Sequence, residues 1–81
     1  MKVTVFSTPT CPWCKKVKTF LADRGIVFDD VDVSADSQAA ALMTQKSGQM
    51  GVPVTLVRDE NGGESIVIGY DEKQLSKLLN V

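Results

Sequence analysis

Both cysteines of this 81-residue sequence lie in the stretch STPTCPWCKKVK, which covers residues 7–18, and they are separated by a proline and a tryptophan. Two thiols at this spacing can form a reversible disulfide, hold a soft metal ion or act as a permanent covalent link. The sequence contains no histidine, which is the commonest general base and the commonest metal ligand. Cys11 and Cys14 are therefore the residues whose type and spacing indicate chemistry.

The residues around this pair favour reversible disulfide chemistry. A helix is expected to begin at Pro12, because proline has no N–H to leave unpaired in a first turn and its φ angle is already helical. Cys11 then lies at the amino end of the helix, where free N–H groups and the helix dipole favour a thiolate. Residues three apart share a helix face, so a disulfide can close without unfolding. We expect Cys11 to attack a disulfide and Cys14 to resolve the mixed disulfide.

Two other roles remain open for the pair. A permanent link between Cys11 and Cys14 would close a very short loop, and stabilisation by loop closure grows with loop length, so its benefit would be small. A zinc site would lack two of its four ligands. Copper(I) suits two thiolates, so a thiol-based copper or iron–sulfur carrier is the rival from another functional class. Copper chaperones usually have a methionine shortly before the first cysteine, whereas Pro9 and Thr10 precede it here.

The composition describes a small globular chain, which we expect to form a single domain over residues 1–81. Hydrophobic residues make up 43% and charged residues 23%, with a net charge of -1. A net charge near zero disfavours nucleic acid as a partner, and no apolar run approaches the ~20 residues of a membrane span. The start MKVTVFS lacks the apolar core of a secretory signal. We expect a cytoplasmic monomer, in a compartment where a close cysteine pair is more often catalytic or metal-binding than structural.

The first half of the chain predicts two strands and two helices. KVTVFS indicates a strand that ends at Ser7, and a helix is expected from Pro12 to about Arg24, with Gly25 as its stop. The lysines on this helix, at positions 15, 16 and 18, are interpreted as a solvated face. IVFDDVDV indicates a second strand with a solvated or edge-like face. Ser34 is expected to cap a second helix that ends before Gly48. The apolar face of that helix consists of Ala39, Leu42 and Met43.

The second half predicts a hairpin and a last helix. VPVTLV and ESIVIG flank RDENGG, whose Asn61 and Gly62 suit a tight turn between antiparallel strands. Asp71 and Gln74 form a capping box for a helix that buries Leu75, Leu78 and Leu79. The order β-α-β-α-β-β-α predicts an α/β fold with a four-stranded mixed sheet flanked by three helices, in which the first two strands are parallel. The cysteines follow the first strand, at the sheet edge where ligands usually bind.

A second motif lies far from the cysteines in the sequence. GQMGVPVTL places Pro53 at the opening of the third strand, a position that tolerates a residue without an N–H. CPWC after a first strand, Val52-Pro53 before a hairpin, and IGYDEKQL before a last helix together resemble the glutaredoxin group of the thioredoxin superfamily, over essentially the whole chain. The resemblance implies a thioredoxin-like fold and a cis Val52-Pro53 bond that faces the dithiol. It also implies that the backbone of Val52 pairs with an incoming peptide or glutathione.

The candidate site therefore has two catalytic residues, Cys11 and Cys14, and a substrate-binding set. That set consists of Pro12, Trp13, Val52, Pro53, Tyr70 and Asp71. Trp13 is expected to be exposed between the cysteines, where it gates access or stacks on a partner, and Tyr70 is expected to border the same groove. Simple packing is the alternative for both aromatic residues. No cofactor and no bound metal are expected.

Departures from the family pattern concern the electron donor. Glutathione-using glutaredoxins usually carry CPYC, a lysine three residues before the first cysteine, and a Gly-Gly-x-Asp segment at the last helix. Trp13 replaces the tyrosine here, Thr8 replaces the lysine, and Ile68 replaces the first glycine. The segment GYD before a helix resembles NrdH-type redoxins, which pass electrons from a flavin- or iron–sulfur-dependent reductase to ribonucleotide reductase. We expect disulfide-containing protein substrates, with ribonucleotide reductase as one candidate. The expected donor is a thioredoxin-reductase-like or ferredoxin-dependent reductase, with glutathione as the alternative.

Overall fold

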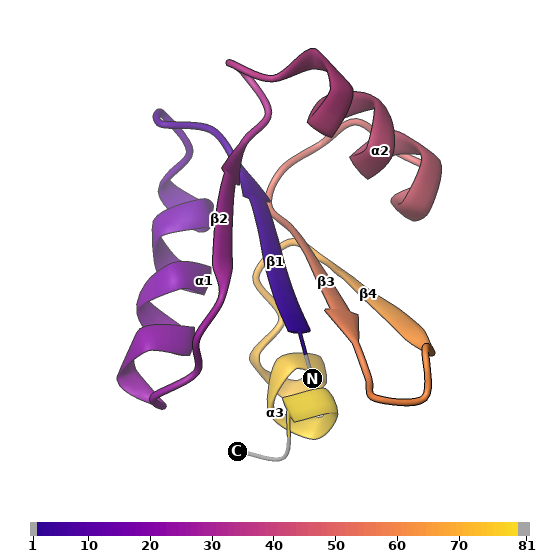
Figure 1. The fold of residues 1–81 in the computed structure, drawn as a ribbon. Coiled ribbons are helices and arrows are strands. Elements are labelled where there is room, and N and C mark those ends of the chain that lie inside the picture. The colour runs from indigo at the N-terminus through magenta and orange to yellow at the C-terminus, as the bar shows by residue number, and fades with distance from the viewer. Residues whose placement is uncertain (1, 80–81) are drawn as a thin grey trace.

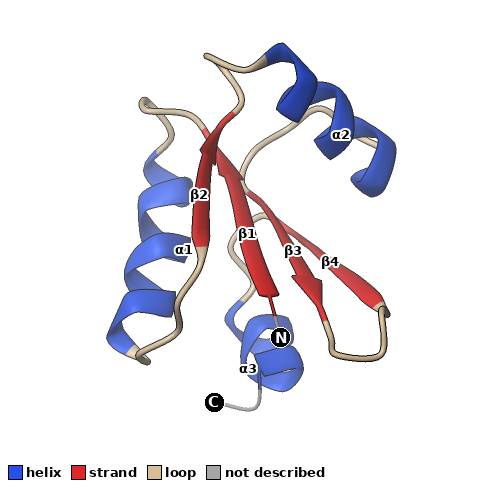
Figure 2. Cartoon of the chain, in the orientation of Figure 1, coloured by secondary structure: helices blue, strands red, loops and turns tan. Residues whose placement is uncertain are grey.

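The computed structural model describes residues 2–79, which form one mixed sheet and three helices in the predicted order (Figures 1 and 2). The strands are β1 (Lys2–Ser7), β2 (Asp29–Asp32), β3 (Val54–Arg58) and β4 (Glu64–Ile68). The helices are α1 (Pro12–Asp23), α2 (Ser37–Ser47) and α3 (Glu72–Leu79). The predicted fold class is confirmed.

The strand order across the sheet is β2-β1-β3-β4, so β1 and β3 are the central strands. β1 is parallel to β2, to which α1 connects it, and antiparallel to β3, while β3 and β4 form the expected antiparallel hairpin. The two central strands carry most of the buried residues of the sheet, although Thr4 of β1 is only partly buried. The carboxyl end of β1 and the amino end of β3 meet at the same edge of the sheet, because Phe6 pairs with Val54.

Helices cover both faces of the sheet (Figure 1). One face packs against α1 and α3, where the buried cluster includes Val5 of β1, Leu21 of α1 and Leu75 of α3. The opposite face packs against α2, where Phe6 lies with Met43. Side chains alternate along a strand, so Val3, Val5 and Ser7 of β1 point toward α1 and α3. This alternation determines which side chains can approach α1 near the cysteines.

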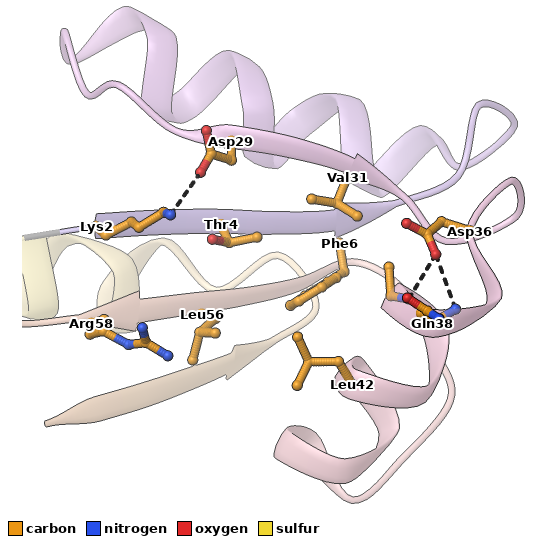
Figure 3. A pocket seen from close by; sticks show the side chains of 11 residues that line it. Lys2, Thr4, Phe6, Asp29, Val31, Asp36, Gln38, Leu42, Leu56 and Arg58 are labelled. Atoms are coloured by element: carbon orange, nitrogen blue, oxygen red, sulfur yellow. Dashed lines mark hydrogen bonds and ion pairs between the residues drawn. The ribbon is translucent and has the colours of Figure 1, made fainter. Parts of the chain in front are cut away.

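The short helix α2 leaves part of its sheet face uncovered. A hollow of about 450 Å³ remains there, with an apolar floor that includes Phe6 and Leu56 and a rim that carries Lys2, Asp29 and Arg58 (Figure 3). Leu42 lines this hollow and is 41% exposed, so only Met43 of the expected apolar face is fully buried. The sequence pattern overestimated the contact because Leu42 borders this hollow instead of packing on the sheet.

Asp36, and not the predicted Ser34, caps α2. Its carboxylate oxygen Oδ1 accepts hydrogen bonds from the backbone N–H groups of Gln38 and Ala39 at 3.0 and 3.1 Å. Ser34 lies outside the helix, where its N–H and its hydroxyl both donate to Asp32 Oδ1. Ser34 is therefore part of the turn between β2 and α2, and Asp36 accepts the hydrogen bonds of the first helix N–H groups.

Two predicted boundaries in the strands are also wrong. β2 covers only Asp29–Asp32 because its pairing with β1 begins at Thr4, and Val27 in the preceding segment is 91% exposed. The hairpin between β3 and β4 is a longer loop than the expected tight turn. Asp59 Oδ1 accepts from the N–H groups of Asn61 and Gly63 in this loop, and Gly62 takes the positive φ of 84°.

The last helix begins as expected. Asp71 Oδ1 accepts a hydrogen bond from the Gln74 N–H at 3.2 Å, which is the first half of the predicted capping box. Leu75 is fully buried, whereas Leu78 and Leu79 are only partly buried at the edge of the same cluster. Within residues 2–79, none of the helices has the length and apolar character needed to cross a bilayer.

Candidate active site

Cys11 is the N-cap residue of α1. Its backbone is extended, with φ -92° and ψ 110°, and Pro12 follows as the first helical residue. The Cys14 N–H donates a hydrogen bond to Cys11 Sγ at 3.1 Å, so the sulfur takes the place that a serine or aspartate oxygen usually has at a helix start. A backbone donor aimed at this sulfur, together with the positive end of the helix dipole, favours negative charge there.

The two thiols differ in their access to solvent. Both are free, but Cys11 is partly exposed whereas Cys14 is fully buried. Burial is the main cause that raises the pKa of the Cys14 thiol from 9.0 to about 11, and the hydrogen bond with Cys11 adds to it. A backbone hydrogen bond with Thr8 acts in the opposite direction. Cys14 is therefore a protonated thiol at neutral pH, and only Cys11 can meet the sulfur of an incoming substrate.

This asymmetry predicts selective alkylation. Iodoacetamide at neutral pH should modify Cys11 and leave Cys14 unmodified in the native protein, whereas both should react in denaturant. Peptide mapping by mass spectrometry checks this result, and equal labelling of both thiols in the native state would contradict it.

The native Cys14 thiol also keeps its proton to a higher pH than the thiol of the unfolded chain. The free energy of unfolding should therefore fall as the pH rises from about 9 to about 11.

A small hollow of about 290 Å³ lies beside the cysteine motif. It is lined by Trp13, Val52, Pro53, Gly69 and Tyr70. The Val52-Pro53 bond is cis, as the family resemblance implied, and Pro53 is buried. The Gly69 N–H donates to the Pro53 carbonyl at 2.8 Å, which joins the segment before β3 to the end of β4. Residues from three distant parts of the sequence thus form one concave surface, to which the cysteine motif contributes Trp13.

Trp13 and Tyr70 form the aromatic part of this hollow. Their ring centroids lie 6.2 Å apart, and the Trp13 side is open, since this residue is 54% exposed. Lys16 Nζ lies 4.6 Å from the Trp13 ring centroid on the outer surface of α1. The Tyr70 hydroxyl donates to Glu72 at 2.6 Å, and this bond raises the pKa of Tyr70. Each ring therefore packs on a neighbour and also borders the hollow.

The remaining predicted site residues lie at its margin. Pro12 is exposed in the first turn of α1 and contributes nothing to the lining of the hollow. Asp71 follows Tyr70 directly, but its carboxylate caps α3. Four of the six predicted substrate-binding residues therefore share one hollow. Across residues 2–79, no group of three or more histidine, cysteine or acidic side chains is suited to hold a metal ion.

Sequence reasoning missed three polar residues that bond to one another where α1 packs on the sheet, one helical turn beyond Cys14. Lys18 was assigned to a solvated lysine face, but its Nζ lies 3.1 Å from Asp30 Oδ2, and the buried Ser7 donates to Asp30 Oδ1 at 2.9 Å. One signal was present in the sequence. Lys18 follows Cys14 by four residues, which places both on the same face of the helix.

This sequence and this fold are similar to those of known proteins. Residues 3–61 match the family model for glutaredoxin. An uncharacterized glutaredoxin-like protein of 8.6 kDa from the rubredoxin operon of Clostridium pasteurianum is 39% identical over 77 residues, which cover 95% of this chain and 96% of that protein. The solved glutaredoxin of Archaeoglobus fulgidus has a TM-score of 0.84 at 26% identity, covering 99% of this chain and 87% of that one. The NrdH-redoxin of Escherichia coli shares the fold, with a TM-score of 0.81 at 22% identity over 96% and 95% of the two chains.

Proposed function

We propose that this chain, which belongs to the glutaredoxin family and is a thiol–disulfide oxidoreductase, reduces disulfides through Cys11 and Cys14. The proposed compartment is the cytoplasm. One observation carries the assignment of roles. Cys11 is a partly exposed helix cap whose sulfur accepts a backbone hydrogen bond, whereas Cys14 is buried and protonated at neutral pH. The exposed sulfur acts as the nucleophile, and the buried one resolves the intermediate.

The reaction consists of two exchanges. The Cys11 thiolate attacks a substrate disulfide, forms a mixed disulfide, and displaces one substrate sulfur with its electron pair. The Cys14 sulfur then attacks the sulfur of Cys11, and the second substrate sulfur leaves. The substrate gains two electrons and two protons, and the protein is left with a Cys11–Cys14 disulfide. A donor must supply two electrons and two protons to restore the dithiol.

The hollow that Trp13 of the cysteine motif borders is the proposed substrate site. Val52 lies before the cis bond and at the rim of the sheet, so its backbone groups can pair with an extended substrate segment. Trp13 and Tyr70 offer ring faces on which an apolar or aromatic substrate side chain can pack. Disulfide-containing proteins fit such a surface, and ribonucleotide reductase is one candidate among them.

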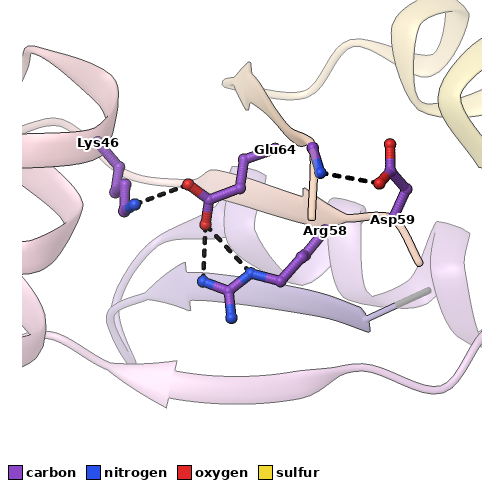
Figure 4. Close-up of polar contacts among 5 residues, drawn as sticks. Lys46, Arg58, Asp59 and Glu64 are labelled. Atoms are coloured by element: carbon purple, nitrogen blue, oxygen red, sulfur yellow. Dashed lines mark hydrogen bonds and ion pairs between the residues drawn. The ribbon is translucent and has the colours of Figure 1, made fainter. Parts of the chain in front are cut away.

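The proposed donor is a protein reductase of the thioredoxin-reductase-like or ferredoxin-dependent kind. Thr8 supplies no positive charge before Cys11, and Ile68 is half exposed at the end of β4, where glutathione-using relatives have glycine. Two cations elsewhere are engaged with another partner. Lys46 and Arg58 both bind Glu64 at 2.7 Å (Figure 4). Arg58 is also the last residue of β3, whereas Pro53 precedes the first residue of that strand. If glutathione binds weakly, the donor is a protein that docks on the surface around the dithiol.

Thiol counting tests this function against that of a metal carrier. The reduced protein should lose both free thiols when it meets a disulfide substrate, while substrate thiols appear in equal number, and the purified protein should contain no stoichiometric metal. Bound copper or a coloured cluster at one equivalent, with thiols that a disulfide substrate does not oxidise, would support the carrier and contradict the proposal.

A further inference from the structure

The ion pair of Lys18 and Asp30 lies one helical turn beyond Cys14. Its Nζ to Oδ2 distance is 3.1 Å, and the Lys18 side chain is only 26% exposed. The pair ties α1 to the edge strand β2, and the buried hydroxyl of Ser7 at the end of β1 fixes the second carboxylate oxygen of Asp30. The carboxylate thus has partners on both oxygens, and the position of the ammonium group is well defined.

This pair is on the same side of the sheet as Cys14. Side chains alternate along the parallel strands β1 and β2, so those of Ser7 and Asp30 point toward α1. Lys18 follows Cys14 by four residues, so the two share one face of α1. The charged or titratable groups that act on the Cys14 thiol are Cys11 and Lys18. Burial, the largest influence, raises the pKa of Cys14. The backbone hydrogen bond with Thr8 and, as the smallest influence, the positive charge of Lys18 oppose that rise.

Resolution of the mixed disulfide needs such a charge. The Cys14 sulfur must lose its proton before or as it attacks the sulfur of Cys11, and the departing substrate sulfur takes up a proton from solvent. The negative charge that forms on Cys14 lies in a site closed to water, since this residue has no exposed surface. A nearby cation lowers the free energy of that charged state.

We propose that Lys18 and Asp30 are positioning residues that set the rate of the resolving step, an inference that rests on the proposed exchange through Cys11 and Cys14. Lys18 stabilises the negative charge that forms on Cys14. Asp30 holds Lys18 in place and partly cancels its charge. Asp32 of β2 is two residues from Asp30, so its side chain lies on the same face of the sheet as that of Asp30.

Two substitutions that break the same ion pair should therefore have opposite effects. Lys18→Gln removes the positive charge that favours the Cys14 thiolate and should slow the resolving step. Asp30→Asn leaves the positive charge of Lys18 unopposed and should accelerate it. A shift of about one pKa unit changes the rate at neutral pH by roughly threefold, because a more basic thiolate is scarcer but also more nucleophilic. A purely structural role of the pair would move both rates in the same direction.

Stopped-flow kinetics with excess dithiobis(nitrobenzoate) separate the two steps, since each step releases one coloured thiolate. The first phase, attack by Cys11, depends on the reagent concentration, and the second phase, resolution by Cys14, does not. We expect the second phase to be about threefold slower in Lys18→Gln and about threefold faster in Asp30→Asn at neutral pH, with the first phase unchanged. Higher ionic strength should shrink both differences, because the two charges are partly exposed.

Two further variants act as controls. Lys18→Arg keeps the positive charge and should keep the second-phase rate of the unchanged protein. Lys73→Gln removes an exposed lysine of α3 and the same net charge, and it should leave both phases unaltered. Second-phase rates that fall in both Lys18→Gln and Asp30→Asn, or that change in neither, would overturn the inference. Absence of any second phase in the unchanged protein would instead contradict the proposed function.

Discussion

Cys11→Ser is expected to abolish disulfide reduction. Only Cys11 is both partly exposed and at the amino end of α1, and the remaining Cys14 is buried with a pKa of about 11. A serine hydroxyl at this position is not a nucleophile toward disulfides at neutral pH. Initial rates with a protein disulfide measure the effect, and they should fall to the rate without enzyme.

Cys14→Ser is expected to stop the reaction one step later. Cys11 still attacks, but no second sulfur resolves the mixed disulfide, so a covalent adduct with the substrate should accumulate and disappear on addition of a reducing agent. The adduct is measured by non-reducing electrophoresis and intact mass. Cys11→Ser is the matched control, since it retains one cysteine and should give no adduct. Equal loss of activity in both variants without an adduct would contradict the division of roles.

Glutathione is expected to be a poor reductant of this protein. In the glutathione-using relatives that the sequence resembles, a lysine and a glycine serve the charged ends and the close backbone approach of the tripeptide. Thr8 and Ile68 occupy these positions here, and Ile68 is 53% exposed. A charge-assisted hydrogen bond contributes about 1.5 to 3 kcal/mol, so its absence should weaken glutathione binding roughly ten- to a hundredfold. The dithiol chemistry should be unaffected.

A coupled assay measures this preference. Glutathione with its own reductase, or a thioredoxin-type reductase, is supplied as the donor while the protein turns over on a small mixed disulfide. The double variant Thr8→Lys and Ile68→Gly should gain rate with glutathione and keep its rate with the protein reductase. Rates with glutathione that equal those of a CPYC glutaredoxin under the same conditions would contradict the expectation.

The parts of the site that local chemistry defines could be predicted from the sequence. Cys11 and Cys14 are recognisable because a proline fixes the helix start between them, and because β1 before them is rich in β-branched and aromatic residues. The cis Val52-Pro53 bond was expected from the family resemblance and is present. Trp13 and Tyr70 were expected to border one groove, and they do so because the strand order brings the end of β4 near the start of α1.

The parts that depend on how elements pack could not be predicted in the same way. The pairing of Lys18 with Asp30 requires the register between β1 and β2 and the position of α1 above them, neither of which the local pattern specifies. Ser34 and Asp36 are both good helix caps, and the choice between them depends on the turn that Asp32 forms with Ser34. The incomplete cover of the sheet by α2 likewise reflects the path of the chain after β2.

The order in which the two sulfurs react tests the central claim most directly. The reduced protein is mixed with an isotopically labelled small disulfide, the reaction is stopped with acid at successive times, and the label is located by peptide mapping. The label should appear first on Cys11 alone, and then be lost as a Cys11–Cys14 disulfide forms. Label on Cys14, or label that stays on Cys11 without formation of the internal disulfide, would contradict the account.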